Sequence, residues 1–127
     1  MQPNEKAQVI QKYIAAYNAF DVDSMLELLS PRVRFENWSG AHLTTETSGI
    51  EEFRQLAEQA KTMFSEREQR ITAIKHNPDS VIVSIAYRGQ LAVDIPEGPR
   101  AGTVLDLDGE SEFSFDGPLI SKINDRS

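Results

Sequence analysis

Residues 9–38 have the sequence VIQKYIAAYNAFDVDSMLELLSPRVRFENW, in which two helical patterns are followed by an alternating one. The first helix is predicted over residues 4–20, where apolar residues recur at steps of three and four: Ile10, Tyr13, Ile14, Tyr17 and Phe20. Asp21 can cap a second helix, which ends before Pro31 because proline disfavours a helical residue in front of it. Residues 33–38 alternate between apolar and polar side chains and predict a strand.

The rest of the chain predicts one more helix and then a run of strands. Residues 39–48 have a loop composition, after which Ser48 and Glu51 form a capping-box pattern for a helix ending near Phe64. Alternating segments separated by turn residues predict four further strands, at residues 69–75, 81–93, 103–115 and 119–123. Helices in the first half and antiparallel strands in the second are typical of an α+β fold with helices on one sheet face.

Length and charge narrow the classes of function. The 127 residues fit a single domain over residues 1–127, and the formal net charge is −7. An acidic surface repels phosphate backbones and anionic headgroups, so we expect neither nucleic-acid nor membrane-surface binding. The absence of cysteine excludes disulfides and thiolate metal sites. A polar N-terminus and the lack of an apolar run of roughly 18 residues predict a cytoplasmic protein.

Several short motifs of the chain match one known family in order and spacing. The first helix ends in Tyr-Asn-Ala (17–19), an Asp-x-Asp link follows (21–23), and the first strand contains Phe-Glu-Asn (35–37). Residues 48–53 and 113–117 continue the match. In these motifs the chain resembles the ketosteroid isomerase and SnoaL-like group of the nuclear transport factor two superfamily. The resemblance implies a cone-shaped, cystatin-like roll, whose curved antiparallel sheet wraps around the N-terminal helices and encloses an apolar cavity.

The resemblance also places the positions that carry chemistry in ketosteroid isomerases. The tyrosine that stabilises an oxyanion falls on Tyr13, the general base on Asn37, and the acidic hydrogen-bond donor on Ser111. A carboxamide does not accept a proton near neutral pH, and a general base contributes about 10²–10⁴-fold in rate. Each position also has a purely structural interpretation: Tyr13 as a core aromatic, Asn37 as a polar strand end, and Ser111 as a small residue on a crowded face.

Further residues are predicted to bind the ligand or to lie near it. Those predicted to line the cavity are aromatic or aliphatic: Tyr17, Phe35, Trp38, Phe53, Tyr87, Leu107 and Phe113. His42, in the loop after the first strand, is an alternative base at the cavity mouth, or simply a solvated residue. His42 and His76 lack the spacing of metal ligands, so neither a metal nor a cofactor is expected.

Three functions fit this sequence. The first is an enzyme resembling SnoaL-like cyclases, isomerases or dehydratases, which acts without a cofactor on a small apolar carbonyl compound through an unidentified proton acceptor. The second is a non-catalytic domain that binds a small apolar molecule, and the third is a homodimerisation module that uses the outer sheet face. A titratable group in the cavity favours the enzyme, neutral polar groups alone favour the binding domain, and a filled cavity favours the dimerisation module.

Overall fold

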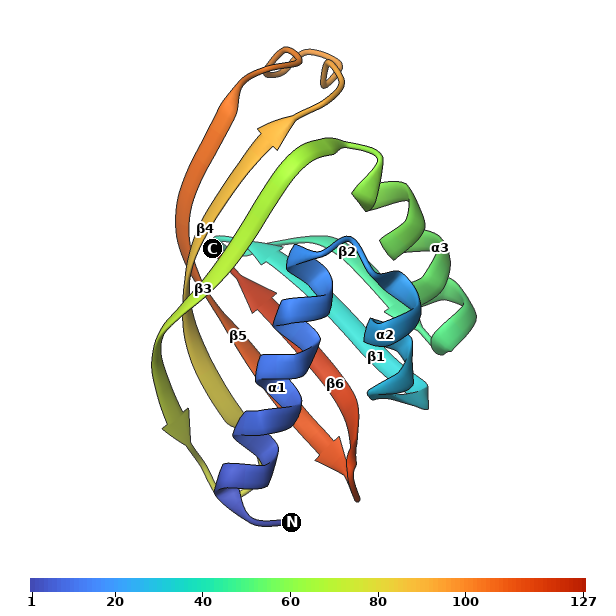
Figure 1. Cartoon of the computed structure of the whole chain (residues 1–127), viewed down its shortest axis with the longest axis vertical. Helices are drawn as coiled ribbons and strands as arrows, with labels where there is room; N and C mark the ends of the chain where they lie inside the picture. The colour runs from blue at the N-terminus through green and yellow to red at the C-terminus, as the bar shows by residue number, and fades with distance from the viewer.

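The computed structural model describes residues 1–127 and contains three helices and six strands. In chain order these are α1 (Pro3–Asn18), α2 (Val22–Glu27), β1 (Leu29–Ser39), β2 (His42–Ser48), α3 (Ile50–Lys61), β3 (Phe64–His76), β4 (Val81–Leu91), β5 (Val104–Asp116) and β6 (Leu119–Arg126). The helices lie together on the concave side of one curved sheet (Figure 1). The predicted α+β class and the roll around the N-terminal helices are confirmed.

The strands form an open, mixed sheet in the order β2-β1-β6-β5-β4-β3. Four of the five neighbouring pairs are antiparallel, but β1 and β6 run parallel. The predicted antiparallel pairing is therefore confirmed at four pairs, and β1–β6 is the exception. Its physical reason is the long excursion of the chain between the two strands, through α3 and β3–β5, which returns β6 to the side of β1 in the same direction (Figure 1).

The predicted loop over residues 39–48 is also wrong in part, because β2 occupies most of it. This strand pairs antiparallel with β1, from Arg34 opposite Ser48 to Ser39 opposite His42. It lies at the sheet edge and consists mostly of polar residues, so no apolar alternation marks it. Its threonines nevertheless favour extended backbone, because their branched side chains fit a pleated surface.

The N-terminal ends of α2 and α3 are stabilised in different ways. The carboxylate of Asp21 accepts hydrogen bonds from the backbone N and the Oγ of Ser24, as predicted for a helix cap. The start of α3 differs from the predicted capping box. Gly49 precedes this helix with φ +87°, a backbone angle that favours glycine, and the backbone N of Ser48 donates to Glu52.

The apolar core lies between the helices and one half of the sheet. Its least exposed members come from α1 and from the central strands: Ile10, Val33, Val81, Val83, Phe113, Ile120 and Ile123. Phe113, 1% exposed, meets the ring of Tyr13 edge-on with centroids 5.8 Å apart. Burying a phenylalanine of this size contributes about 1.5–3 kcal/mol. On the inner face of β5, the large side chain of Phe113 fills the space near the C-terminal end of the strand. The smaller Ser111 and Gly109 before it leave space for a cavity.

Candidate functional site

A cavity of about 410 Å³ lies between the helices and the other half of the inner sheet face. Aromatic side chains form much of its wall: Tyr13, Tyr17, Phe35, Phe53, Phe64 and Tyr87. Polar and charged side chains join them from the central strands and from β3, among them Asn37, Arg67, Ser111 and Asp125. A mostly apolar hollow with a few polar groups is the usual form of a small-molecule site. No group of three or more potential metal-ligating side chains comes together anywhere in the chain.

Three polar residues form a row across the inner face of the sheet. On the parallel pair β1–β6, Asn37 lies opposite Asp125, and on the antiparallel pair β5–β6, Ser111 lies opposite the same residue. Residues in register on neighbouring strands share a face, so all three side chains line the cavity. The Oγ of Ser111 donates to Oδ1 of Asp125 at 2.6 Å. The row therefore places a carboxyl group between the two predicted polar positions.

Asp125 is the residue of this row that sequence reasoning missed. Burial raises the pKa of its carboxyl group to about 6, although the Ser111 hydrogen bond and the charge of Arg126 act in the opposite direction. A carboxyl group with such a pKa can both accept and return a proton near neutral pH. The predicted last strand stopped at Ile123, but β6 runs to Arg126. Asp125 has the same parity as the buried Ile123, and this was the available signal.

Tyr13 comes from the buried face of α1 and lines the cavity with 6% of its surface exposed. Burial is the main cause that raises its pKa well above that of a free tyrosine, and the negative charge of Asp125 adds to the effect. The phenol therefore keeps its proton and is available as a hydrogen-bond donor. The edge-on contact with Phe113 fixes the plane of the ring. Tyr13 thus has features of both interpretations, a core aromatic and a donor at the cavity wall.

Asn37 also combines a structural contact with a place in the cavity wall. Its Nδ2 donates to Oγ1 of Thr44 at 2.7 Å, and that hydroxyl donates to the backbone oxygen of Asn37 at 3.0 Å. Thr44 lies at the irregularity where the register of β1 and β2 shifts. These two bonds hold the amide in place at the sheet edge. The amide Oδ1 takes part in neither bond.

The remaining predicted ligand-binding residues separate into two groups. Five line the cavity, namely Tyr17, Phe35, Phe53, Tyr87 and Leu107, and their contact with a ligand stays a prediction. Trp38 and Phe113 lie outside the lining. Trp38 has the opposite parity to Asn37, and its Nε1 donates to Oε1 of Glu36 at 3.1 Å. Phe113 is core rather than cavity wall, because α1 covers it.

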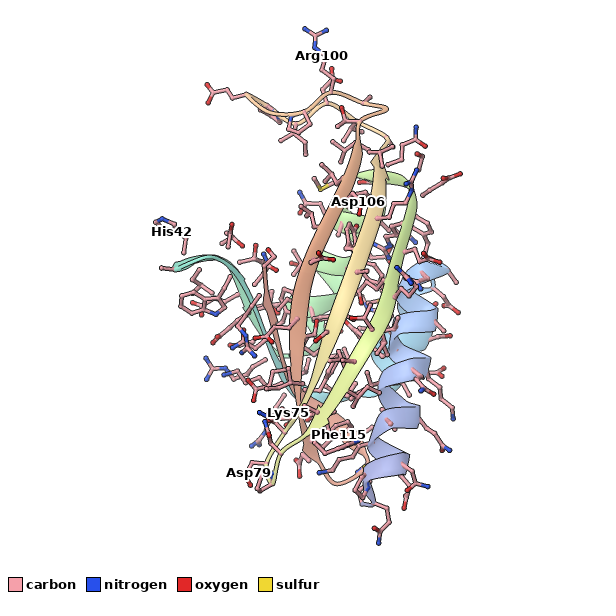
Figure 2. All side chains as sticks on the ribbon, turned by 90° about the vertical axis from the view of Figure 1, so that its left-hand side faces the viewer. His42, Lys75, Asp79, Arg100, Asp106 and Phe115 are labelled. Carbon is pink, nitrogen blue, oxygen red and sulfur yellow. The ribbon has the colours of Figure 1, made fainter.

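His42, the alternative base, lies far from this row. It is exposed at the tip of the β1–β2 hairpin and points away from the body of the molecule (Figure 2). The cavity lining does not include it. The structure therefore gives His42 no contact with the cavity that Asp125 and Tyr13 line.

A second charged residue of the wall, Arg67, was also not predicted from the sequence. It belongs to β3 and is 6% exposed, with its guanidinium carbon 3.7 Å from the ring centroid of Tyr17. The hydroxyl of Tyr17 donates to that of Tyr87 at 3.2 Å. An arginine with the inward parity of a strand was the signal in the sequence, but β3 lacks a clear apolar alternation.

The comparisons with known proteins agree with this architecture. The family model for the SnoaL-like domain matches residues 10–123, so the chain belongs to the SnoaL-like family. Among curated proteins, none matches the sequence. No helix of the chain is long and apolar enough to cross a bilayer.

Solved structures extend the likeness to the whole fold. A candidate polyketide cyclase from Xanthomonas campestris pv. campestris superposes with a TM-score of 0.81 at 20% identity, covering 98% of this chain and 90% of its own. A candidate SnoaL-like polyketide cyclase from Jannaschia sp. CCS1 gives 0.80 at 14% identity, with 98% and 88% covered. TsrD from Streptomyces laurentii gives 0.80 at 17%, with 98% and 89% covered. At these identities the likeness shows a common fold.

Proposed function

We propose that this chain is a cofactor-independent enzyme that binds a small apolar carbonyl compound in its cavity and moves a proton on it. The observation that carries the proposal is the Asp125 carboxyl group, which lies in the cavity wall with a pKa near 6. A general base is most effective when its pKa lies near the working pH. SnoaL-like membership and the likeness to candidate polyketide cyclases support a reaction of this class.

The chemistry follows from the residues that surround the carboxylate. Asp125 takes a proton from the carbon next to the substrate carbonyl, and the electron pair of the broken C–H bond moves onto the carbonyl oxygen as an enolate. The Tyr13 hydroxyl donates a hydrogen bond to that oxygen, which stabilises the developing charge. Where the substrate has a carbon–carbon double bond between its β and γ carbons, the enolate is a dienolate, and protonated Asp125 returns the proton to the γ carbon, which moves the double bond into conjugation with the carbonyl. Alternatively, the enolate carbon attacks a second carbonyl of the substrate and closes a ring, and Asp125 protonates the new alkoxide.

Asp125 can supply the proton acceptor that Asn37, at the expected position of the base, cannot provide. The proton acceptor is absent from the expected position on β1, but the neighbouring strand β6 supplies one in register, where adjacent strands lie about 4.8 Å apart. Ser111 donates to Asp125 and holds one carboxyl oxygen, leaving the other for the substrate proton. In this arrangement Asn37 orients the substrate and Ser111 orients the base.

A non-catalytic binding domain is the alternative, and the amide of Asn37 at the expected base position favours it. Such a domain is expected to have only neutral polar groups in its pocket, whereas Asp125 and Arg67 bring charge to the wall. A pure dimerisation module is expected to have its interior filled by side chains, and the cavity of about 410 Å³ argues against it. The catalytic hypothesis therefore explains more features of the cavity wall than either alternative does.

Deuterium exchange tests the proposal without knowledge of the natural substrate. Apolar ketones and enones are incubated with the protein in D₂O, and loss of the C–H signal next to the carbonyl is followed by NMR. We expect the wild type to catalyse exchange. In Asp125→Asn the exchange rate should fall by at least about 100-fold, which is the smallest rate contribution typical of a general base. Asp116→Asn, at the exposed end of β5, is the matched control and should exchange like wild type. Equal rates in Asp125→Asn and wild type would reject Asp125 as the base.

A further inference from the structure

The cavity contains a positive charge that the proposed proton transfer does not use. Arg67 is 6% exposed, lines the cavity, and forms no ion pair with any carboxylate of the chain. Arginine is almost never so buried unless an acidic group pairs with it. The formal net charge of −7 makes the lack of such a partner more unusual, because acidic residues outnumber basic ones. We therefore expect the charge of Arg67 to pair with an acidic group of a bound ligand.

The contacts of Arg67 hold the guanidinium in place and leave its end free. Its Nε donates to the backbone oxygen of Tyr17 at 3.0 Å, which caps the C-terminal end of α1 with one of five N–H donors. The guanidinium carbon lies 3.7 Å from the ring centroid of Tyr17 and 4.5 Å from that of Phe20. Neither terminal nitrogen donates to a protein acceptor. Nor is either sealed from solvent, because the buried atoms without partners are Thr47 Oγ1 and Asn124 Oδ1.

Two tyrosines add a neutral donor beside this cation. The Tyr17 hydroxyl donates to the Tyr87 hydroxyl at 3.2 Å, so the proton of Tyr87 is free for another acceptor. Both tyrosines line the cavity together with Arg67. The guanidinium end and the Tyr87 hydroxyl therefore form a group of donors without an acceptor, and we call these two residues with Tyr17 the cationic pole.

The cationic pole lies away from Asp125 along the sheet. Tyr87 is four residues beyond Val83 on β4, and Val83 lies opposite Ser111, which binds Asp125. Because a strand rises about 3.3 Å per residue, four residues separate the two backbone positions by roughly 13 Å. Apolar side chains such as Ile85 line the wall between them. A ligand that reaches both ends has a polar group at each and an apolar body.

We propose that the ligand is an apolar carboxylic acid, whose carboxylate binds the terminal nitrogens of Arg67 and the hydroxyl of Tyr87 while its ketone lies at Asp125. The planar guanidinium matches a carboxylate with two parallel hydrogen bonds, which no neutral oxygen matches as well. The inference rests on the proposed function, because it assigns the second end of the same substrate. It narrows the substrate class from carbonyl compounds to keto acids.

A matched pair of ligands tests this assignment. The probes are 6-oxo-6-phenylhexanoic acid and its methyl ester, which share the ketone and the apolar body, and binding is measured by calorimetry near neutral pH. We expect wild type to bind the acid at least about tenfold more tightly than the ester, as charge-assisted hydrogen bonds imply. Arg67→Gln and Arg67→Met should bind the two probes equally, and Arg67→Lys should keep part of the preference. Arg100→Gln, in the exposed β4–β5 loop, is the control and should keep all of it (Figure 2).

The outcomes separate this inference from the proposed function. Equal binding of acid and ester by wild type, failure of both to bind, or a preference that survives in the Arg67 variants would overturn the assignment of the carboxylate. If the protein catalyses deuterium exchange on the ester but does not bind the acid more tightly, the proposed function is supported and the carboxylate assignment is rejected. A strong acid preference that Asp125→Asn retains, with no exchange in any variant, would support the cationic pole and reject the enzyme. Circular dichroism of each Arg67 variant shows whether it is folded before binding is compared.

Discussion

Asn37 and Asp125 lie opposite each other on the parallel strands β1 and β6, with both side chains at the wall of one cavity. The first occupies the position that resemblance to ketosteroid isomerases assigns to the base, and it cannot act as one. The second has a pKa near 6 and is able to do so. A carboxylate on the neighbouring strand can therefore act as the base in the same cavity. The absence of an acidic residue from one position does not by itself remove acid–base chemistry from the fold.

Ser111→Ala should move the pH profile of the reaction to higher pH. The hydrogen bond from Ser111 lowers the pKa of Asp125, so its removal raises that pKa further above about 6. Because the base acts when ionised, the rising limb of the rate against pH should shift upward, and Ser111→Thr should restore it. Carbon-13 NMR titration of the carboxyl group reads the same shift directly. Ser114→Ala, at the opposite parity of β5, serves as the control. An unshifted profile would show that Ser111 does not act on the base.

Asn37→Asp should place two carboxylates side by side. Like charges on adjacent strands disfavour ionisation of both, so the two groups should share a proton and titrate in two separated steps. The upper step should lie above the pKa of Asp125 in the wild type, which is about 6. NMR titration of the two carboxyl carbons measures both steps. Independent titration of each group near its ordinary value would contradict the side-by-side placement.

Asp125→Asn should stabilise the protein above pH 6. The carboxyl group has a pKa of 3.8 as a free group and about 6 in the folded chain, so the folded state binds more protons between these values. Stability is therefore highest below this window and falls as pH rises through it, by up to about 3 kcal/mol for two pKa units. Asp21 and Glu112 have lowered pKa values and act in the opposite direction, so the decline is read from the difference in unfolding free energy between wild type and Asp125→Asn, measured with urea from pH 3.5 to 8. A difference that does not change with pH would mean that the carboxyl group is not desolvated.

Tyr13→Phe should separate the two roles of this side chain. The ring and its contact with Phe113 are kept, whereas the donor hydroxyl at the cavity wall is lost. We expect deuterium exchange to fall by about tenfold or more, in line with one lost charge-assisted hydrogen bond. Thermal unfolding should change little, because the packing remains. An unchanged exchange rate would rule out Tyr13 as the group that stabilises the enolate.

The outer face of the sheet is where we propose that two copies of the chain associate. On this face the guanidinium of Arg126 binds Glu110 at 2.8 Å and Glu112 at 3.0 Å, which reduces the repulsion that two acidic faces would otherwise have. Light scattering after size exclusion should give the mass of a dimer for wild type. Arg126→Glu should give a monomer, and Arg100→Glu, in the exposed β4–β5 loop, should not (Figure 2). A monomeric wild type at every concentration would reject the interface.

Local patterns in the sequence predicted most of the helices and strands, and the exceptions have a common cause. α1 and α2 have a strong apolar periodicity, and Asp21 caps α2 as its side chain suggests. By contrast, β2 is polar at the sheet edge, so its pairing with β1 leaves no apolar alternation to detect. The end of β6, with its inward residue Asp125, was missed because the residues that follow Ile123 are polar.

The amino-acid order determined the class of fold, the inward faces of its elements and the inward positions of Tyr13, Asn37 and Ser111, because periodicity of three to four or of two residues is a local property of the chain. The tertiary structure decided that β1 and β6 pair in parallel and that Asp125 stands between Asn37 and Ser111. It also decided that Arg67 packs against the rings of Tyr17 and Phe20. Such meetings depend on which distant strands become neighbours, and long-range packing of the whole chain selects them rather than any local pattern.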